Sequence, residues 1–177
     1  MLVFQPWVGK DYWDNGLAGR RLLILGESHY GEKGSEYPGF TSEVVKEWGQ
    51  NKRAAFFTKI CNLCLNKEDN SISDEARSDF WEKVAFYNYI QELLPGPRCR
   101  PTEEMWAAGA TPFLQVVKDL KPNLILVLGK ELEGHLPGIE KDLFFVTPHP
   151  SSSRFTYEPY MQNLKERFAS IPLNLKN

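Results

Sequence analysis

Cysteines and long apolar runs are scarce in this sequence of 177 residues. The three cysteines, Cys61, Cys64 and Cys99, are an odd number without the density of a disulfide-stapled secreted scaffold, which indicates a reducing compartment. No run reaches the ~18 to 20 apolar residues that span a bilayer. The N-terminus has neither the basic start nor the apolar stretch of a signal peptide. We therefore expect a cytoplasmic chain without a membrane partner.

An excess of basic charge is also missing. The chain has 21 basic and 23 acidic side chains and a net charge of −2, so it lacks the broad basic surface of a protein that coats nucleic acid. Any contact with nucleic acid must be local. The glycine patterns of Walker phosphate loops and of dinucleotide-binding folds are absent too, which removes the main support for those enzyme classes.

The apolar content, 42% of the residues, is enough for one core, and we expect a single domain over residues 1–177. Short apolar runs predict strands at residues 21–26, 83–88, 124–129 and 143–147, and helical spacing predicts helices at residues 41–50, 52–65, 74–80 and 158–168. A longer helix opens at Thr102 and ends before Pro122. Strands that alternate with helices pair in parallel, so the predicted fold is α/β: a three-layer α/β/α sandwich with a central four-stranded parallel sheet.

Several local expectations accompany this fold. Thr41 is expected to cap its helix, residues 67–78 to begin as a polar surface connection, and residues 95–97 to form a loop because of their two prolines. The two cysteines of residues 52–65 are expected in the core rather than at a metal. The long helix is expected to turn inward Trp106, Phe113, Leu114, Val117 and Leu120.

Two strands are followed by polar segments that carry candidate chemistry. The first is followed by Glu27, Ser28, His29 and Tyr30, and the last by Pro148, His149, Pro150, Ser151, Ser152, Ser153 and Arg154. The carboxyl ends of parallel strands are where α/β sheets build their sites, so these segments are predicted to share one pocket. The two prolines restrict the backbone around His149 and so aim its ring. The alternative for the first segment is a helix-capping loop with a solvated Glu27 and His29. The alternative for the second is a capping turn in which His149 satisfies a backbone carbonyl.

Two further residues fit such a pocket. Asn88 ends the second predicted strand, and its carboxamide can match the carbonyl and N–H edge of a pyrimidine. Phe40 is a candidate stacking platform. Taken singly, Asn88 could instead satisfy a loop backbone, and Phe40 could be part of the core.

Together these motifs resemble the uracil-DNA glycosylase superfamily over most of the chain. Residues 26–30 are similar to the family's first motif in its glutamate-bearing form, His149 to Ser151 are similar to its second motif, and Phe40 lies where the family has its base-stacking aromatic. The central pattern of the iron-sulfur branch is matched in order and spacing by Asn88, Arg98, Pro101, Glu104, Phe113, Leu114, Leu120, Pro122 and residues 126–129.

The sequence departs from the family at four places, one of which is His29, where the resembling branches often have proline. Ser28 stands where the classical branch has an aspartate. Tyr30 agrees with that branch, in which the tyrosine ring at this place excludes the methyl group of thymine. Serines follow the second motif in place of the apolar wedge that fills a vacated base stack, so Arg154 or Phe155 would have to serve. The iron-sulfur branch's four cysteines are not matched, and we expect no metal and no cofactor.

The resemblance implies a hydrolase of N-glycosidic bonds that removes uracil or a related damaged base from DNA. His149 would stabilise charge on the departing base and Glu27 would orient water or screen the sugar cation. Ser28, Tyr30, Phe40 and Asn88 would bind the base. The residues expected to contact the DNA are Arg98, Arg100, Ser151, Ser152, Ser153 and Arg154, with Lys130 beside them. The alternatives are an inactive binding module of the same fold, or action on another lesion or a free nucleoside.

Overall fold

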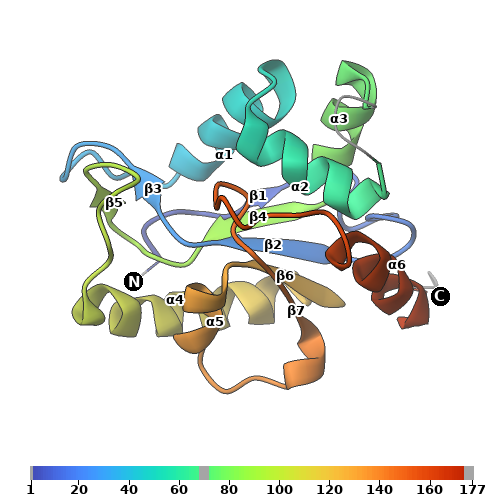
Figure 1. Cartoon of the computed structure of the whole chain (residues 1–177). Helices are drawn as coiled ribbons and strands as arrows, with labels where there is room; N and C mark the ends of the chain where they lie inside the picture. The colour runs from blue at the N-terminus through green and yellow to red at the C-terminus, as the bar shows by residue number, and fades with distance from the viewer. Residues whose placement is uncertain (1, 68–71, 174–177) are drawn as a thin grey trace.

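The chain is built around a mostly parallel five-stranded sheet (Figure 1), in a computed structural model that describes residues 2–67 and 72–173. In spatial order the strands are β1 (Trp7–Val8), β4 (Ala85–Asn88), β2 (Leu22–Gly26), β6 (Leu124–Leu128) and β7 (Phe144–Thr147). The pairs β2·β4, β2·β6 and β6·β7 are parallel, and β1 pairs antiparallel with β4 at the edge. The four predicted strands are therefore confirmed as parallel neighbours. The prediction of a sheet with only four strands is wrong, because the two-residue β1 is too short to show a pattern.

Side chains alternate between two cores along the central strands. In β2, Leu22 and Ile24 belong to one apolar cluster and Leu23 and Leu25 to another, and β6 divides in the same way. All five residues of each strand are buried. Burial on both faces explains why these strands are continuous apolar runs rather than alternating ones.

Helices cover both faces of the sheet (Figure 1), as the three-layer prediction requires. Helices α1, α2 and α3 lie above one face, α4 and α5 below the other, and α6 packs against α2 at one end. Within the described ranges the six α-helices are α1 (Phe40–Val44), α2 (Ala55–Leu65), α3 (Asp74–Trp81), α4 (Glu103–Leu120), α5 (Lys130–Gly134) and α6 (Tyr160–Ser170). The remaining elements are a π-helix η1 (Val45–Asn51), a 3₁₀ turn η2 (Lys141–Leu143) and a small parallel pair, β3 (His29–Tyr30) with β5 (Leu93–Leu94).

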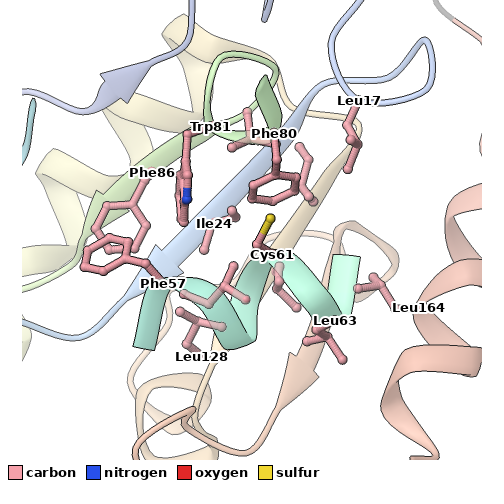
Figure 2. Packing of buried hydrophobic residues seen from close by; sticks show 14 of the residues in the cluster. Leu17, Ile24, Phe57, Cys61, Leu63, Phe80, Trp81, Phe86, Leu128 and Leu164 are labelled. Atoms are coloured by element: carbon pink, nitrogen blue, oxygen red, sulfur yellow. The ribbon is translucent and has the colours of Figure 1, made fainter. Parts of the chain in front are cut away.

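Figure 2 shows the core on the α2 side of the sheet, where Phe57, Cys61, Trp81 and Phe86 pack around Ile24. Cys61 is fully buried, and burial raises the pKa of its thiol to about 12. Cys64 is half-buried, and burial raises its pKa as well. Both are free thiols on α2, as expected of core cysteines. In the described part of the chain no three His, Cys, Asp or Glu side chains are grouped as metal ligands would be.

Several local predictions need correction. Thr41 does not cap α1: the N-cap is Gly39, without a side-chain bond, and the Thr41 hydroxyl instead bonds His29. Leu114 is 43% exposed rather than inward, because it lies on the solvent side of α4. The helix predicted at 41–50 is α1 continued by the π-helix, and α2 begins three residues later than predicted.

Other predictions hold within two residues. Thr102 caps α4, and its hydroxyl accepts a hydrogen bond from the Met105 N–H at 3.3 Å. The predicted surface connection at 67–78 gives way to α3, and residues 68–71 lie outside the described ranges.

Over residues 2–67 and 72–173, no helix combines the length and apolar character that a bilayer crossing requires.

Candidate functional site

The strand order locates a cleft at the carboxyl end of the sheet. From β2 the chain crosses to β4 on one side and later returns to β6 on the other side, so the loops after β2 and β6 diverge. Ligands of open α/β sheets bind at such a switch point. A cavity of about 1280 Å³ lies there, lined by residues that follow β2, β6 and β7 and by Asn88 at the end of β4.

The cavity brings together nearly all the predicted site residues. Those that line it are Glu27, Ser28, Tyr30, Phe40, Asn88, Arg100, His149, Ser151, Ser152, Ser153 and Arg154. Lys130 lines it as well. Arg98 is exposed in the same loop as Arg100 but is not among the lining residues. The structure therefore places the predicted site residues at one cavity, with Arg98 outside its lining.

Asn88 is positioned by its pairing with Gly26. The two residues are partners in the β2·β4 register, and a Cβ atom at residue 26 would lie 2.1 Å from the Asn88 Oδ1 atom. A glycine is thus required so that the carboxamide can lie across the end of β2. Asn88 is 5% exposed, and its backbone carbonyl accepts a hydrogen bond from the Gln91 side-chain amide at 3.1 Å. Gln91 also accepts bonds from the Val3 and Phe4 N–H groups, which ties the N-terminal segment to this loop.

His149 has a defined tautomer. Its Nδ1 atom accepts a hydrogen bond from the Ser151 backbone N–H at 3.2 Å, so the neutral ring carries its proton on Nε2. Burial lowers the pKa of His149 below its usual value, and the positive charge of Arg100 lowers it further. The ring lies 5.4 Å from the Phe56 ring, which lines the same cavity. The cavity therefore contains a neutral imidazole whose Nε2–H is available as a donor.

Glu27 lies in a charged group that the sequence did not show. Burial raises the pKa of its half-buried carboxyl, and the neighbouring Glu131 raises it further, whereas Arg100 and His135 oppose the shift. Arg100 forms an ion pair with Glu131. Glu131 lies on α5, which follows β6. Its position just beyond the end of a strand was the one feature of the sequence that could have indicated a site residue.

Ser28 and Tyr30 line the cavity beside Glu27. The Ser28 hydroxyl is buried and has no hydrogen bond of normal geometry among the described residues. It lies near enough to the Tyr30 phenol to lower the pKa of that phenol. Burial has the larger effect and raises the Tyr30 pKa. Tyr30 is 44% exposed, so its ring forms part of the cavity rim.

Phe40 belongs to an aromatic cluster at the start of α1. Its ring centroid lies 5.0 Å from that of His29, 5.6 Å from Tyr37 and 5.7 Å from Phe4. His29 is buried, its Nε2 lies 2.9 Å from the Thr41 hydroxyl, and burial lowers its pKa to about 4. Phe40 is half-buried, so it both packs in this cluster and presents a ring to the cavity. His29 thus packs against the Phe40 ring that lines the cavity.

A neutral buried His29 makes stability depend on pH. Its pKa is about 4 in the folded protein and about 6.5 in the unfolded chain, so the unfolded chain takes up the proton first as pH falls. We expect protonation of His29 to leave the free energy of unfolding unchanged above pH 6.5. As pH falls from there to about 4, the free energy of unfolding should decrease by on the order of 3 kcal/mol. Urea unfolding of wild type and His29→Asn between those pH values measures this. Equal pH dependence in both proteins would contradict the assignment.

The two candidate wedge residues differ in position. Phe155 does not line the cavity: its ring lies 5.3 Å from the Tyr157 ring, and the Lys59 ammonium lies 5.2 Å from its centre. The Lys59 Nζ atom also donates to the Pro150 carbonyl at 2.9 Å, which anchors the loop. Arg154 is exposed and lines the cavity. Of the two candidate wedge residues, the structure therefore places Arg154 at the cavity and Phe155 outside it.

Trp48 is a lining residue that the sequence prediction placed only on a helix. It lies on η1 and is 44% exposed at the cavity. A helical register of 3.6 residues per turn did not identify its direction, because the π-helix shifts the register.

Comparison of the chain with models of known protein families finds no match, and comparison with curated proteins finds none either.

Proposed function

We propose that this protein is a DNA glycosylase of the uracil-DNA glycosylase superfamily, which hydrolyses the N-glycosidic bond of uracil or a related damaged base. The observation that carries the proposal is the His149 ring, whose Nδ1 is held by the Ser151 amide and whose Nε2–H has no partner among the described residues, in a cavity also lined by Asn88 and Phe40. The order of motifs along the chain and the position of the cavity at the sheet's switch point support it.

The cavity has the groups needed to hold a base removed from the stack. Extrusion of a nucleotide costs a few kcal/mol, which stacking and pocket hydrogen bonds recover. Phe40 offers a stacking surface, and the Asn88 carboxamide offers an acceptor and donors to the edge of a pyrimidine. Tyr30, at the rim, would stand against a substituent at the base's 5-position.

The chemical step uses His149 and Glu27. When the bond between the sugar C1′ and the base nitrogen breaks, both electrons leave with the base and negative charge develops on its carbonyl oxygen. The Nε2–H of His149 donates a hydrogen bond to that oxygen and stabilises the charge as it appears. The carboxylate of Glu27 screens the sugar cation and accepts a hydrogen bond from the water that adds to C1′. That water gives its proton to the Glu27 carboxylate, and the departed base anion takes up a proton from solvent, which yields the free base. Glu27 would thereby replace the carboxylate absent at Ser28.

Release of free base from a uracil-containing oligonucleotide tests the proposal. We expect free uracil and an alkali-labile abasic site from wild-type protein, and no release from a thymine-containing control. A panel of oligonucleotides with other lesions extends the test. Binding without release from any lesion would instead support an inactive binding module, which the serine at position 28 favours.

Asn88 is expected to control discrimination between bases. Asn88→Ala removes the partner of a specific base edge, so the ratio of uracil to cytosine cleavage should fall by roughly 10- to 100-fold. Affinity for undamaged DNA should change little, since the backbone contacts remain. Single-turnover cleavage of matched oligonucleotides and fluorescence anisotropy measure the two quantities. Asn15→Ala is the control, because Asn15 is exposed and does not line the cavity. An unchanged uracil-to-cytosine ratio in Asn88→Ala would refute this role.

A further inference from the structure

Trp48 is exposed at the cavity because the segment around it is fixed to the core. Its neighbour Gly49 packs so closely that a Cβ atom there would lie 3.1 Å from the Trp81 Nε1 atom and 3.3 Å from the Phe57 ring. The buried Arg77 guanidinium donates hydrogen bonds to the backbone carbonyls of Gly49 and, at 2.8 Å, Lys52. These contacts hold η1 in place and leave the indole 44% exposed. π-helical turns frequently occur at functional sites.

The surroundings of Trp48 combine aromatic surface with positive charge. The Lys52 ammonium lies 4.5 Å from the centre of its ring and also forms an ion pair with Glu47. The same cavity is lined by residues 151–153, which carry hydroxyls, and by Lys130 and Arg154, neither of which forms an ion pair among the described residues. Stacking rings beside cations that can track phosphates are what single-stranded nucleic acids require.

The size of the cavity and the polar side chains of the loop after β7 point the same way. Its volume of about 1280 Å³ exceeds the roughly 300–1,000 Å³ typical of small-molecule pockets, so there is space beyond one base. Enzymes that kink a duplex commonly insert an apolar side chain into the stack. Here Phe155 packs against Tyr157 and Lys59. The residues that follow His149 in this loop and line the cavity are the three serines 151–153 and Arg154.

We infer that the cavity takes a single-stranded polynucleotide, with Trp48 stacking on a base next to the one held by Phe40 and Asn88. This inference rests on the proposed function for the identity of the held base, but single-strand binding can be measured without cleavage. The bases of a single strand are already free to splay apart, so the protein need not open a duplex.

Fluorescence anisotropy with a labelled oligothymidylate of about 12 nucleotides tests the inference, because site sizes of ~4 to 16 nucleotides are usual. We expect wild type to bind the single strand at least roughly 10-fold more tightly than the same sequence as a duplex. Trp48→Ala should weaken single-strand binding about 5- to 100-fold, the effect of losing one stacked base. Trp48→Phe should retain most of the affinity. Trp13→Ala is the matched control, since Trp13 is 52% exposed and lies away from the cavity.

The outcomes separate this inference from the proposed function. Equal or tighter binding to the duplex, or unchanged binding by Trp48→Ala, would overturn the inference even if uracil release is observed. Single-strand binding that requires Trp48 would uphold it even if no base is released. Preference for an RNA strand of matched sequence would likewise uphold the inference while counting against a DNA substrate. Circular dichroism melting of each variant shows that lost binding is not lost folding.

Discussion

Replacement of His149 by alanine is expected to slow the release of uracil by roughly 10²- to 10³-fold under single-turnover conditions, the range for loss of one donor to a developing oxyanion. The reason is that the Nε2–H is needed mainly when charge appears on the departing base. The Ser151 N–H at 3.2 Å from Nδ1 fixes that proton on the outer nitrogen, so the donor is present before the substrate binds. Affinity for the oligonucleotide should change far less than the rate.

The pH dependence gives an independent check on His149. Burial and Arg100 lower its pKa, so the neutral donor should persist as pH falls below 6.5, where an ordinary imidazole would become charged. We expect the wild-type rate to show no inflection near pH 6.5 that comes from His149. The pH profiles of wild type and His149→Ala should therefore have the same shape in this range. Wild-type rates in His149→Ala would remove this residue from the mechanism, and a loss confined to binding would assign it to recognition instead.

The sheet could be predicted from the sequence because both of its faces are buried. The runs at β2 and β6 are continuously apolar, and strands of that kind alternating with helices leave few topologies. The edge strand β1 and the pair β3·β5 could not be predicted, since two residues carry no periodicity. The helix at 41–50 was located, but its change into a π-helix depends on tertiary contacts of Gly49 that no local pattern shows.

The site was predictable where a residue directly follows a strand. Glu27, Asn88 and His149 converge because parallel strands end at one edge of the sheet. Gly26 makes room for the Asn88 carboxamide, and this role depends on the neighbouring strand, which the local sequence does not show. The ion pair of Arg100 with Glu131 joins a loop to α5 and has no signature in sequence spacing.

Arg77 is a buried charge whose role can be read from its partners. It is 1% exposed, and its guanidinium donates to the carbonyls of Gly49 and Lys52 and forms an ion pair with Asp74 at 3.3 Å. Those two carbonyls lie in the last turn of η1 and just beyond it, where a helix has backbone acceptors without partners of its own. A buried acceptor left without a hydrogen bond costs about 1–3 kcal/mol.

Arg77→Met is therefore expected to reduce the free energy of unfolding by about 2 to 6 kcal/mol, because the methionine fills space but leaves both carbonyls without their donor. Urea unfolding at pH 7 measures the loss. Arg53→Met is the matched control, because Arg53 also pairs with Asp74, at 2.7 Å, but its side chain is 38% exposed. Loss of this exposed ion pair should reduce the free energy of unfolding by no more than about 1 kcal/mol. Loss of the hydrogen bond from Arg53 to the Ile72 carbonyl adds to that figure. If Arg77→Met folds, release of η1 should also weaken single-strand binding, as Trp48→Ala does. A loss equal to that of Arg53→Met would show that the π-helix does not depend on this guanidinium.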